Sequence, residues 1–138
     1  MQFQSNSLSD TAHIAQQLAT TLKPGDCIAL EGNLGAGKTT FVRYLVEALG
    51  GSPNQVSSPT FVLLNVYETP RFNIFHLDAY RVHGADDFET IGFDEILEQD
   101  GIVIVEWASR VKLIMPENCR WISIESTGPN SRRFNLSD

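Results

Sequence analysis

Residues 32–39 read Gly-Asn-Leu-Gly-Ala-Gly-Lys-Thr and match the phosphate-loop pattern G-x-x-x-x-G-K-[ST]. The preceding residues 26–31 are mostly apolar, as in a buried strand, and Phe41, Leu45 and Leu49 recur afterwards at helical spacing. A strand that enters such a loop and a helix that leaves it belong to a βαβ unit. This loop constrains the fold more than any other feature, and its flanks indicate a site for a nucleoside triphosphate.

The residue types in the loop predict how it would contact a nucleotide. Glycines remove the Cβ atoms that would block a phosphate, and successive N–H groups can then point at one anion. We expect Lys38 to bind the β- and γ-phosphates and Thr39 to present its hydroxyl to Mg²⁺. The alternative is an ordinary glycine-rich turn. The nucleotide-binding residues predicted here are Asn33, Leu34, Gly35, Ala36, Gly37, Lys38, Thr39 and Thr40.

Length and charge limit the other functions open to this chain. With 138 residues it is expected to form a single domain, residues 1–138, without room for a large lid or a second domain. The formal charge of −7 disfavours a broad nucleic-acid footprint. The sequence contains no apolar run of about eighteen residues and its start does not resemble a signal peptide, so we expect no membrane association and a cytoplasmic location.

The remaining pattern alternates strands and helices. Helices are expected over residues 11–22, capped by Ser9 or Asp10, and over 85–91 and 93–98. Strands are expected over residues 61–68 and 72–78 as an antiparallel hairpin, over 102–105 as a central parallel strand, and over 121–126 and 133–136. The predicted fold is an α/β P-loop NTPase domain: a mixed, mostly parallel central sheet flanked by helices, with antiparallel hairpin additions.

Two acids follow apolar strands and are candidates for the metal site and for catalysis. Glu106 directly follows residues 102–105, and Asp78 ends the strand at 72–78. A phosphate-loop enzyme needs a carboxylate near Mg²⁺ at such a strand end. Glu106 can bind the metal or orient the attacking water; the alternative is an ion pair with Arg110 or another base. Asp78 can bind metal-linked water; the alternative is a turn-initiating Asp that bonds its own backbone.

Four further positions have two interpretations each. His76 is either a core residue or part of the site, and Trp107 is either a core anchor or a lid or partner contact. Arg81 is either an arginine finger or the partner of Asp86 or Glu89. Thr60, in the Ser-Pro-Thr segment 58–60, is expected to read the γ-phosphate or its Mg²⁺ from a switch loop, the alternative being a plain turn.

Taken together, segments 32–40, 58–61, 76–81 and 106–107 closely resemble the TsaE family, formerly called YjeE. Their order, spacing and near-complete span of the chain make the resemblance specific. It implies an ATPase that supports N6-threonylcarbamoylation of adenosine 37 in tRNAs that read codons starting with A. It further implies that the chain acts on a TsaB–TsaD complex, whose members carry out the transfer and hold the tRNA, so that tRNA is contacted only indirectly.

The resemblance also implies where adenine binds. By family position the contacts come from residues around Leu8 and Thr11 and from Arg132 and Arg133. An arginine can stack on an adenine face, although Arg132 is equally compatible with a solvated charge on a terminal hairpin. No guanine-reading Asn/Thr-Lys-x-Asp segment is present, which favours ATP over GTP.

Two other functions fit a phosphate loop. A small-molecule kinase needs a basic lid, but the chain has only ten Lys and Arg residues. A non-catalytic nucleotide sensor needs no acid that positions water, and Asp78 and Glu106 argue against it. From the residues alone, a Mg²⁺-dependent nucleotide hydrolase is the favoured interpretation.

Overall fold

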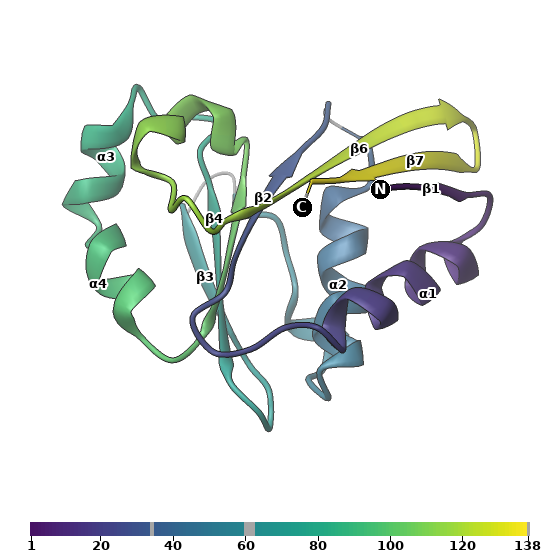
Figure 1. The fold of residues 1–138 in the computed structure, drawn as a ribbon, viewed down its shortest axis with the longest axis horizontal. Coiled ribbons are helices and arrows are strands. Elements are labelled where there is room, and N and C mark those ends of the chain that lie inside the picture. The colour runs from purple at the N-terminus through teal and green to yellow at the C-terminus, as the bar shows by residue number, and fades with distance from the viewer. Residues whose placement is uncertain (34, 60–62, 138) are drawn as a thin grey trace.

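The computed structural model describes residues 1–33, 35–59 and 63–137. They form one seven-stranded sheet with helices on both faces (Figure 1). The strands are β1 (Gln2–Ser5), β2 (Cys27–Glu31), β3 (Leu64–Glu68), β4 (Asn73–Asp78), β5 (Ile102–Glu106), β6 (Arg120–Gly128) and β7 (Ser131–Leu136). The helices are α1 (Leu8–Ala19), α2 (Lys38–Ala48), α3 (Ala85–Thr90) and α4 (Phe93–Glu98), with 3-10 segments η1 (Pro53–Gln55) and η2 (Ala108–Ile114).

The sheet order β1-β7-β6-β2-β5-β4-β3 confirms the predicted fold class. Strands β6, β2, β5 and β4 run parallel in the centre, and β5 lies between β2 and β4. The expected hairpins are the antiparallel pairs β3–β4 and β6–β7. Helices α1 and α2 cover one face of the sheet, and α3, α4 and η2 cover the other (Figure 1). The parallel neighbours β4 and β5 are joined by the crossover that contains α3 and α4.

Alternation along the strands assigns each side chain to one face. In β5, Ile102 and Ile104 pack with α1 and α2, whereas Val103 and Val105 pack with α3 and α4. Glu106 continues the first series, so it faces α2. Asp78 pairs with Glu106 in the register of β4 and β5 and faces the same way. Both acids therefore lie at the carboxyl ends of parallel strands, on the face where α2 begins.

Two predictions near the N-terminus are wrong. Helix α1 begins at Leu8 rather than at residue 11, and its N-cap is Ser7 rather than Ser9 or Asp10. The Asp10 amide donates to Ser7 Oγ at 3.1 Å, and the Asn6 amide donates to Asp10 Oδ2 at 2.9 Å. Asp10 is therefore the N3 residue of a reciprocal arrangement like a capping box, in which its carboxylate accepts from the residue before the cap. Strand β1 was not expected; it is an edge strand that pairs antiparallel with β7 and brings both ends of the described chain together (Figure 1).

Replacing Ser7 by alanine is expected to lower the free energy of unfolding by about 1 kcal/mol, because the Asp10 amide loses its acceptor. Ser9→Ala, in the exposed first turn of the same helix, is the matched control and should change stability by less than about 0.5 kcal/mol. Urea unfolding of both variants measures the difference. Equal losses in the two variants would contradict the assignment of Ser7 as the cap.

Candidate functional site

The phosphate loop joins the end of β2 to the start of α2. Gly37 is the N-cap of α2 with φ of 103°, a left-handed conformation that favours glycine, and no side chain caps the helix. Gly32 cannot carry a side chain, because a Cβ there would lie 2.6 Å from the backbone oxygen of Ile124 in β6. The first amides of α2 are thus available to an anion, and β6 fixes the position of the loop.

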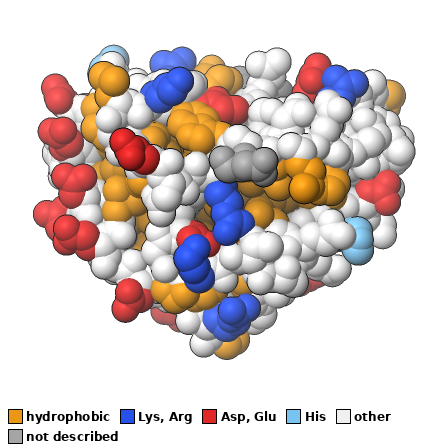
Figure 2. All heavy atoms as spheres, viewed as in Figure 1, with side chains coloured by type: hydrophobic (Ala, Val, Ile, Leu, Met, Phe, Trp, Pro, Cys, Tyr) orange, Lys and Arg blue, Asp and Glu red, His pale blue; other side chains and the backbone are white. Residues whose placement is uncertain are grey.

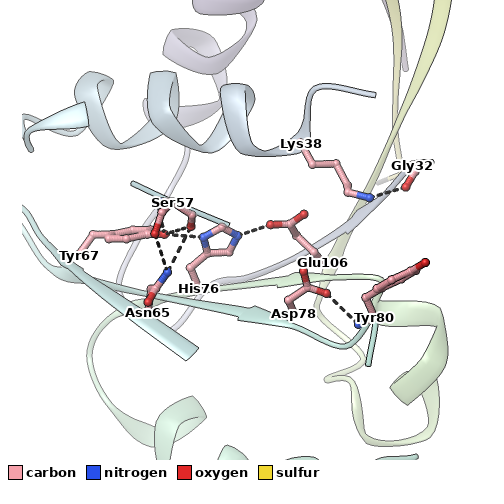
Figure 3. A network of polar contacts seen from close by, with 9 residues as sticks. All are labelled: Gly32, Lys38, Ser57, Asn65, Tyr67, His76, Asp78, Tyr80 and Glu106. Atoms are coloured by element: carbon pink, nitrogen blue, oxygen red, sulfur yellow. Dashed lines mark hydrogen bonds and ion pairs between the residues drawn. The ribbon is translucent and has the colours of Figure 1, made fainter. Parts of the chain in front are cut away.

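Lys38 is 6 % exposed and is enclosed by acids and an aromatic ring. Its Nζ donates to the backbone oxygen of Gly32 (Figure 3). The same nitrogen lies 4.1 Å from the ring centroid of Trp107. Burial lowers the pKa of Lys38, while Glu106, Asp78 and then Glu31 act in the opposite direction. The ammonium group of Lys38 therefore offsets the negative charge of these three carboxylates at the phosphate loop.

Asp78 and Glu106 are 2 % and 3 % exposed and line the same pocket as Lys38 and Thr39. The pocket has a volume of about 360 Å³. Asp78 Oδ1 accepts from the Tyr80 amide at 2.8 Å, as expected for an Asp that begins a turn. The same side chain lines the pocket, so the two interpretations of Asp78 are compatible. Two buried acids side by side are costly unless positive charge or hydrogen bonds compensate them.

The partner of Glu106 is His76, not Arg110. His76 Nε2 lies 2.6 Å from Glu106 Oε2, and the imidazole is fully buried. The Arg110 guanidinium instead lies over the Tyr80 ring, 5.5 Å from its centroid. Both interpretations of His76 apply, because the residue is buried in the core and also contacts Glu106, an acid of the pocket.

Tyr67 is a residue of this region that the sequence analysis missed. Its hydroxyl lies 2.8 Å from His76 Nδ1 and 2.8 Å from the backbone oxygen of Ser57 (Figure 3). The alternation of residues 74, 76 and 78 indicated a polar face on β4. Nothing in the sequence gave the register that sets Tyr67 of β3 beside it.

Trp107 and two arginines have distinct places. Trp107 lines the pocket with a left-handed φ of 57°, and its ring packs on Tyr80 with centroids 4.9 Å apart. Arg132 lines the pocket as well, whereas Arg81 is exposed on the segment after β4. Trp107 thus contacts the lysine and the pocket at the same time, which neither of its two interpretations anticipated.

A second pocket, of about 550 Å³, adjoins the loop on its other side. It brings together Leu8 and Thr11 of α1 with Arg132 of β7, which are three of the four residues expected around adenine. Its further lining residues include Asn6, Asn130 and Phe134, which the sequence analysis did not name. Three residues of this pocket also line the pocket of Lys38, namely Gly37, Thr40 and Arg132. Ala36 also lines a third pocket, beside β6.

Arg132 ties the C-terminal hairpin to the phosphate loop. Its Nε donates to the backbone oxygen of Ala36 at 2.9 Å, and its Nη1 donates to those of Gly128 and Ser131 at 3.2 and 2.8 Å. It is half-buried rather than a solvated charge. Arg133, the next residue on the strand, points the other way and pairs with Glu125 at 3.4 Å, so it does not join the pocket.

Not every predicted binding residue lies in these pockets. Gly35 and Thr39 line the pocket of Lys38, whereas Asn33 lines a separate hollow beside β6. Leu34 and Thr60 were predicted to bind nucleotide or to act in the switch loop, and both lie outside the described residues. Ser58, at the start of the Ser-Pro-Thr segment, does line the pocket of Lys38.

The donors at the pocket suit Mg²⁺ only in combination with phosphate. Among the residues that the structure describes, no three His, Cys, Asp or Glu side chains gather to hold a metal. Magnesium at nucleotide sites is held through one or two carboxylates, a hydroxyl, waters and phosphate oxygens. Thr39, Asp78 and Glu106 line one pocket and supply that hydroxyl and those carboxylates, so the residues fit the ion.

In the part of the chain that the structure describes, no helix is both long and apolar enough to cross a bilayer.

Comparison with known proteins agrees with the geometry. Residues 5–134 match the family model "Threonylcarbamoyl adenosine biosynthesis protein TsaE". Proteins named tRNA threonylcarbamoyladenosine biosynthesis protein TsaE are similar in Rickettsia prowazekii (35 % identity over 127 residues, 92 % of this chain and 88 % of that protein) and in Bacillus subtilis (37 % over 128 residues, 93 % and 79 %). The relative from Aquifex aeolicus is 46 % identical over 107 residues, 77 % of this chain and 75 % of its own.

A solved structure has the same fold. The crystal structure of Bacillus subtilis YdiB superposes with a TM-score of 0.79 at 29 % sequence identity, over 99 % of this chain and 83 % of that one. The family match covers nearly the whole sheet, including the loop, both acids and Arg132. The chain therefore belongs to the TsaE family, a family of P-loop NTPase fold whose members are named for threonylcarbamoyl adenosine biosynthesis.

Proposed function

We propose that this chain is a Mg²⁺-dependent ATPase required for N6-threonylcarbamoylation of adenosine 37 in tRNAs that read codons starting with A. It acts as a single cytoplasmic domain, an accessory subunit that binds the TsaB–TsaD complex and hydrolyses ATP to support its turnover. Membership of the TsaE family supports the pathway. The observation that carries the hydrolase assignment is the pair of buried carboxylates, Asp78 and Glu106, that face Lys38 across one pocket.

The two adjoining pockets support one elongated ligand. The larger pocket, between α1 and the β6–β7 hairpin, suits a base and sugar, and the pocket at Lys38 suits the phosphates. Gly37, Thr40 and Arg132 line both, so a nucleotide can lie across the start of α2. Leu8 supplies an apolar wall and Arg132 a planar cation for adenine. The missing guanine-reading segment favours ATP.

Five side chains that line the phosphate pocket have roles in the proposed reaction. Lys38 and the first amides of α2 bind the β- and γ-phosphates, and Lys38 leaves the Gly32 oxygen to do so. Thr39, Asp78 and Glu106 would hold Mg²⁺, and the ion would neutralise charge on the phosphoryl group that is transferred. Glu106 also orients the attacking water, and Trp107 excludes bulk water from the lysine. Thr60 is proposed to read the γ-phosphate.

The surface charge supports an indirect contact with tRNA. Acidic side chains gather on the side of the molecule that α3 and α4 cover (Figure 2). Asp86, Asp87, Asp94 and Glu95 lie in the first turns of those helices. Such a surface repels a phosphate backbone, so the tRNA is held by the partner complex rather than by this chain.

Steady-state release of phosphate from ATP, with and without the TsaB–TsaD complex, tests the proposal. We expect slow hydrolysis by the chain alone and stimulation of at least about tenfold by the complex, because the partners are proposed to order the pocket. TsaB alone and TsaD alone are the controls. No stimulation would contradict the accessory role, transfer of the γ-phosphate to a small acceptor would indicate a kinase, and ATP binding without cleavage would indicate a sensor.

A further inference from the structure

A chain of hydrogen bonds crosses three neighbouring strands on the α2 face of the sheet. It begins at the backbone of Ser57, passes through the Tyr67 hydroxyl on β3 and the His76 imidazole on β4, and ends at the Glu106 carboxylate on β5 (Figure 3). The three steps measure 2.8, 2.8 and 2.6 Å. The roles proposed above for Glu106 do not account for Tyr67 or His76.

The middle of this hydrogen-bond chain is buried away from solvent. Tyr67 is 1 % exposed and His76 is 0 % exposed, so neither group exchanges its partners with bulk water. Burial raises the pKa of Tyr67, and the hydroxyl keeps its proton. No buried side-chain nitrogen or oxygen among the described residues lacks a partner, so these bonds satisfy groups whose burial would otherwise be costly.

Hydrogen-bond bookkeeping fixes one end of the chain. When Glu106 is an ionised carboxylate, as a role at a cation requires, it only accepts, and His76 Nε2 is then the donor to Glu106 Oε2. The Tyr67 proton points either to Ser57 or to His76 Nδ1, and both arrangements keep Nε2–H directed at Glu106. The imidazole therefore sets the rotation of the carboxylate in the phosphate pocket, as a partner behind a ligand does in other sites.

The other end of the chain holds the segment that enters the pocket. The Ser57 amide donates to the Tyr67 hydroxyl at 3.3 Å, and Asn65 Nδ2 donates to the Ser57 carbonyl and hydroxyl, both at 3.2 Å. The next residue, Ser58, lines the phosphate pocket. A displacement of Ser57 removes one of the partners of Tyr67, and Tyr67 shares its hydroxyl with His76.

We propose that Tyr67 and His76 are positioning residues, which hold Glu106 in the orientation required for hydrolysis and make that orientation depend on the place of Ser57. The proposal rests on the proposed function in that Glu106 serves ATP hydrolysis. It adds a physical connection between the segment before the phosphate pocket and the acid inside it. That connection runs through the sheet and not through the nucleotide.

Tyr67→Phe removes only the hydroxyl. We expect kcat for ATP, measured with the partner complex present, to fall roughly 5- to 20-fold, the equivalent of one or two buried hydrogen bonds, while KM changes less than about twofold. Tyr44→Phe is the matched control, because the Tyr44 ring packs at the edge of the same core and the substitution should leave both constants unchanged. His76→Gln retains a donor toward Glu106 and should keep more activity than His76→Leu.

A double-mutant cycle separates positioning from a general loss of structure. Tyr67→Phe should have no further effect on kcat in a Glu106→Gln background, because the carboxylate that the hydroxyl positions is already absent. A purely structural role would lower kcat by the same factor in both backgrounds. Thermal unfolding of each variant accompanies the kinetics, and His76→Gln replaces Tyr67→Phe if the latter fails to fold.

A second readout needs neither nucleotide nor activity. In the nucleotide-free protein, Glu106→Gln is expected to shift the backbone amide resonance of Ser57, and the shift should vanish when Tyr67 is phenylalanine. The same shift with and without the hydroxyl overturns the relay, as does a wild-type kcat in Tyr67→Phe; either result leaves the proposed function standing. Wild-type protein that hydrolyses no ATP with the complex overturns the proposed function and, with it, the catalytic part of the relay.

Discussion

Lys38→Met is expected to lower the affinity for ATP about 100-fold, close to 2.7 kcal/mol of binding free energy. The substitution keeps the stem of a buried side chain and removes the charge that opposes Glu31, Asp78 and Glu106. A triphosphate then meets these acids without a cation between them, so repulsion is added to the lost hydrogen bond.

Isothermal titration with a non-hydrolysable ATP analogue measures this loss. Lys112→Met, at an exposed lysine of η2, is the control and should bind as the wild type does. The melting temperature of Lys38→Met should fall, because the buried carboxylates of Asp78 and Glu106 lose the positive charge beside them, so binding is measured well below the melting temperature of the variant. Binding within about threefold of wild type would contradict the assignment of Lys38 to the phosphates.

Glu106→Gln is expected to reduce kcat by about 10²- to 10³-fold and to change the affinity for ATP by less than about threefold. The amide has the size of the carboxylate but no charge for a metal and no basic oxygen for water. Lys38 and the backbone of the loop, which are proposed to bind the phosphates, are untouched. The required Mg²⁺ concentration should rise as well, because one proposed ligand loses its charge.

Single-turnover hydrolysis and ATP binding, measured on the same preparation, separate the two effects of Glu106→Gln. Glu98→Gln removes a carboxylate from the exposed end of α4 and is the control for charge alone. Equal losses of binding and turnover would contradict the proposed role of Glu106 in the chemical step. A wild-type rate would assign the catalytic acid to Asp78 instead.

The parts of the fold with strong local signals were predictable. A few consecutive residues were enough to predict the phosphate loop, the β-branched strand β5 and the break between α3 and α4 at Gly92. Strand β1 did not, because a four-residue polar edge strand is stabilised by its partner β7 and not by its own pattern. The start of α1 was misplaced because an Asp can either cap a helix or, as Asp10 does, lie in its first turn and accept from the amide before the cap.

The site residues that follow the ends of strands were predictable from the sequence. The site residues whose place depends on how the strands pair were not. Asp78 and Glu106 stand out because a charged residue follows an apolar run in each case. Arg132 and Arg133 look alike in sequence, and only the alternation of β7 turns one toward the loop and the other toward Glu125. Tyr67 joins His76 through the pairing of β3 with β4, and that pairing is decided by tertiary packing.

The hydrogen-bond chain from Ser57 to Glu106 runs across the strands rather than along them. Adjacent strands lie about 4.8 Å apart, so the steps from Tyr67 to His76 and from His76 to Glu106 each span one strand spacing, whatever the length of polypeptide between the strands. Thirty sequence positions separate His76 from Glu106, yet a single bond joins them. Insertions in the β3–β4 turn or around α3 and α4 can therefore accumulate without lengthening this path, and the surface that meets other molecules can diverge while the connection inside the sheet keeps its dimensions.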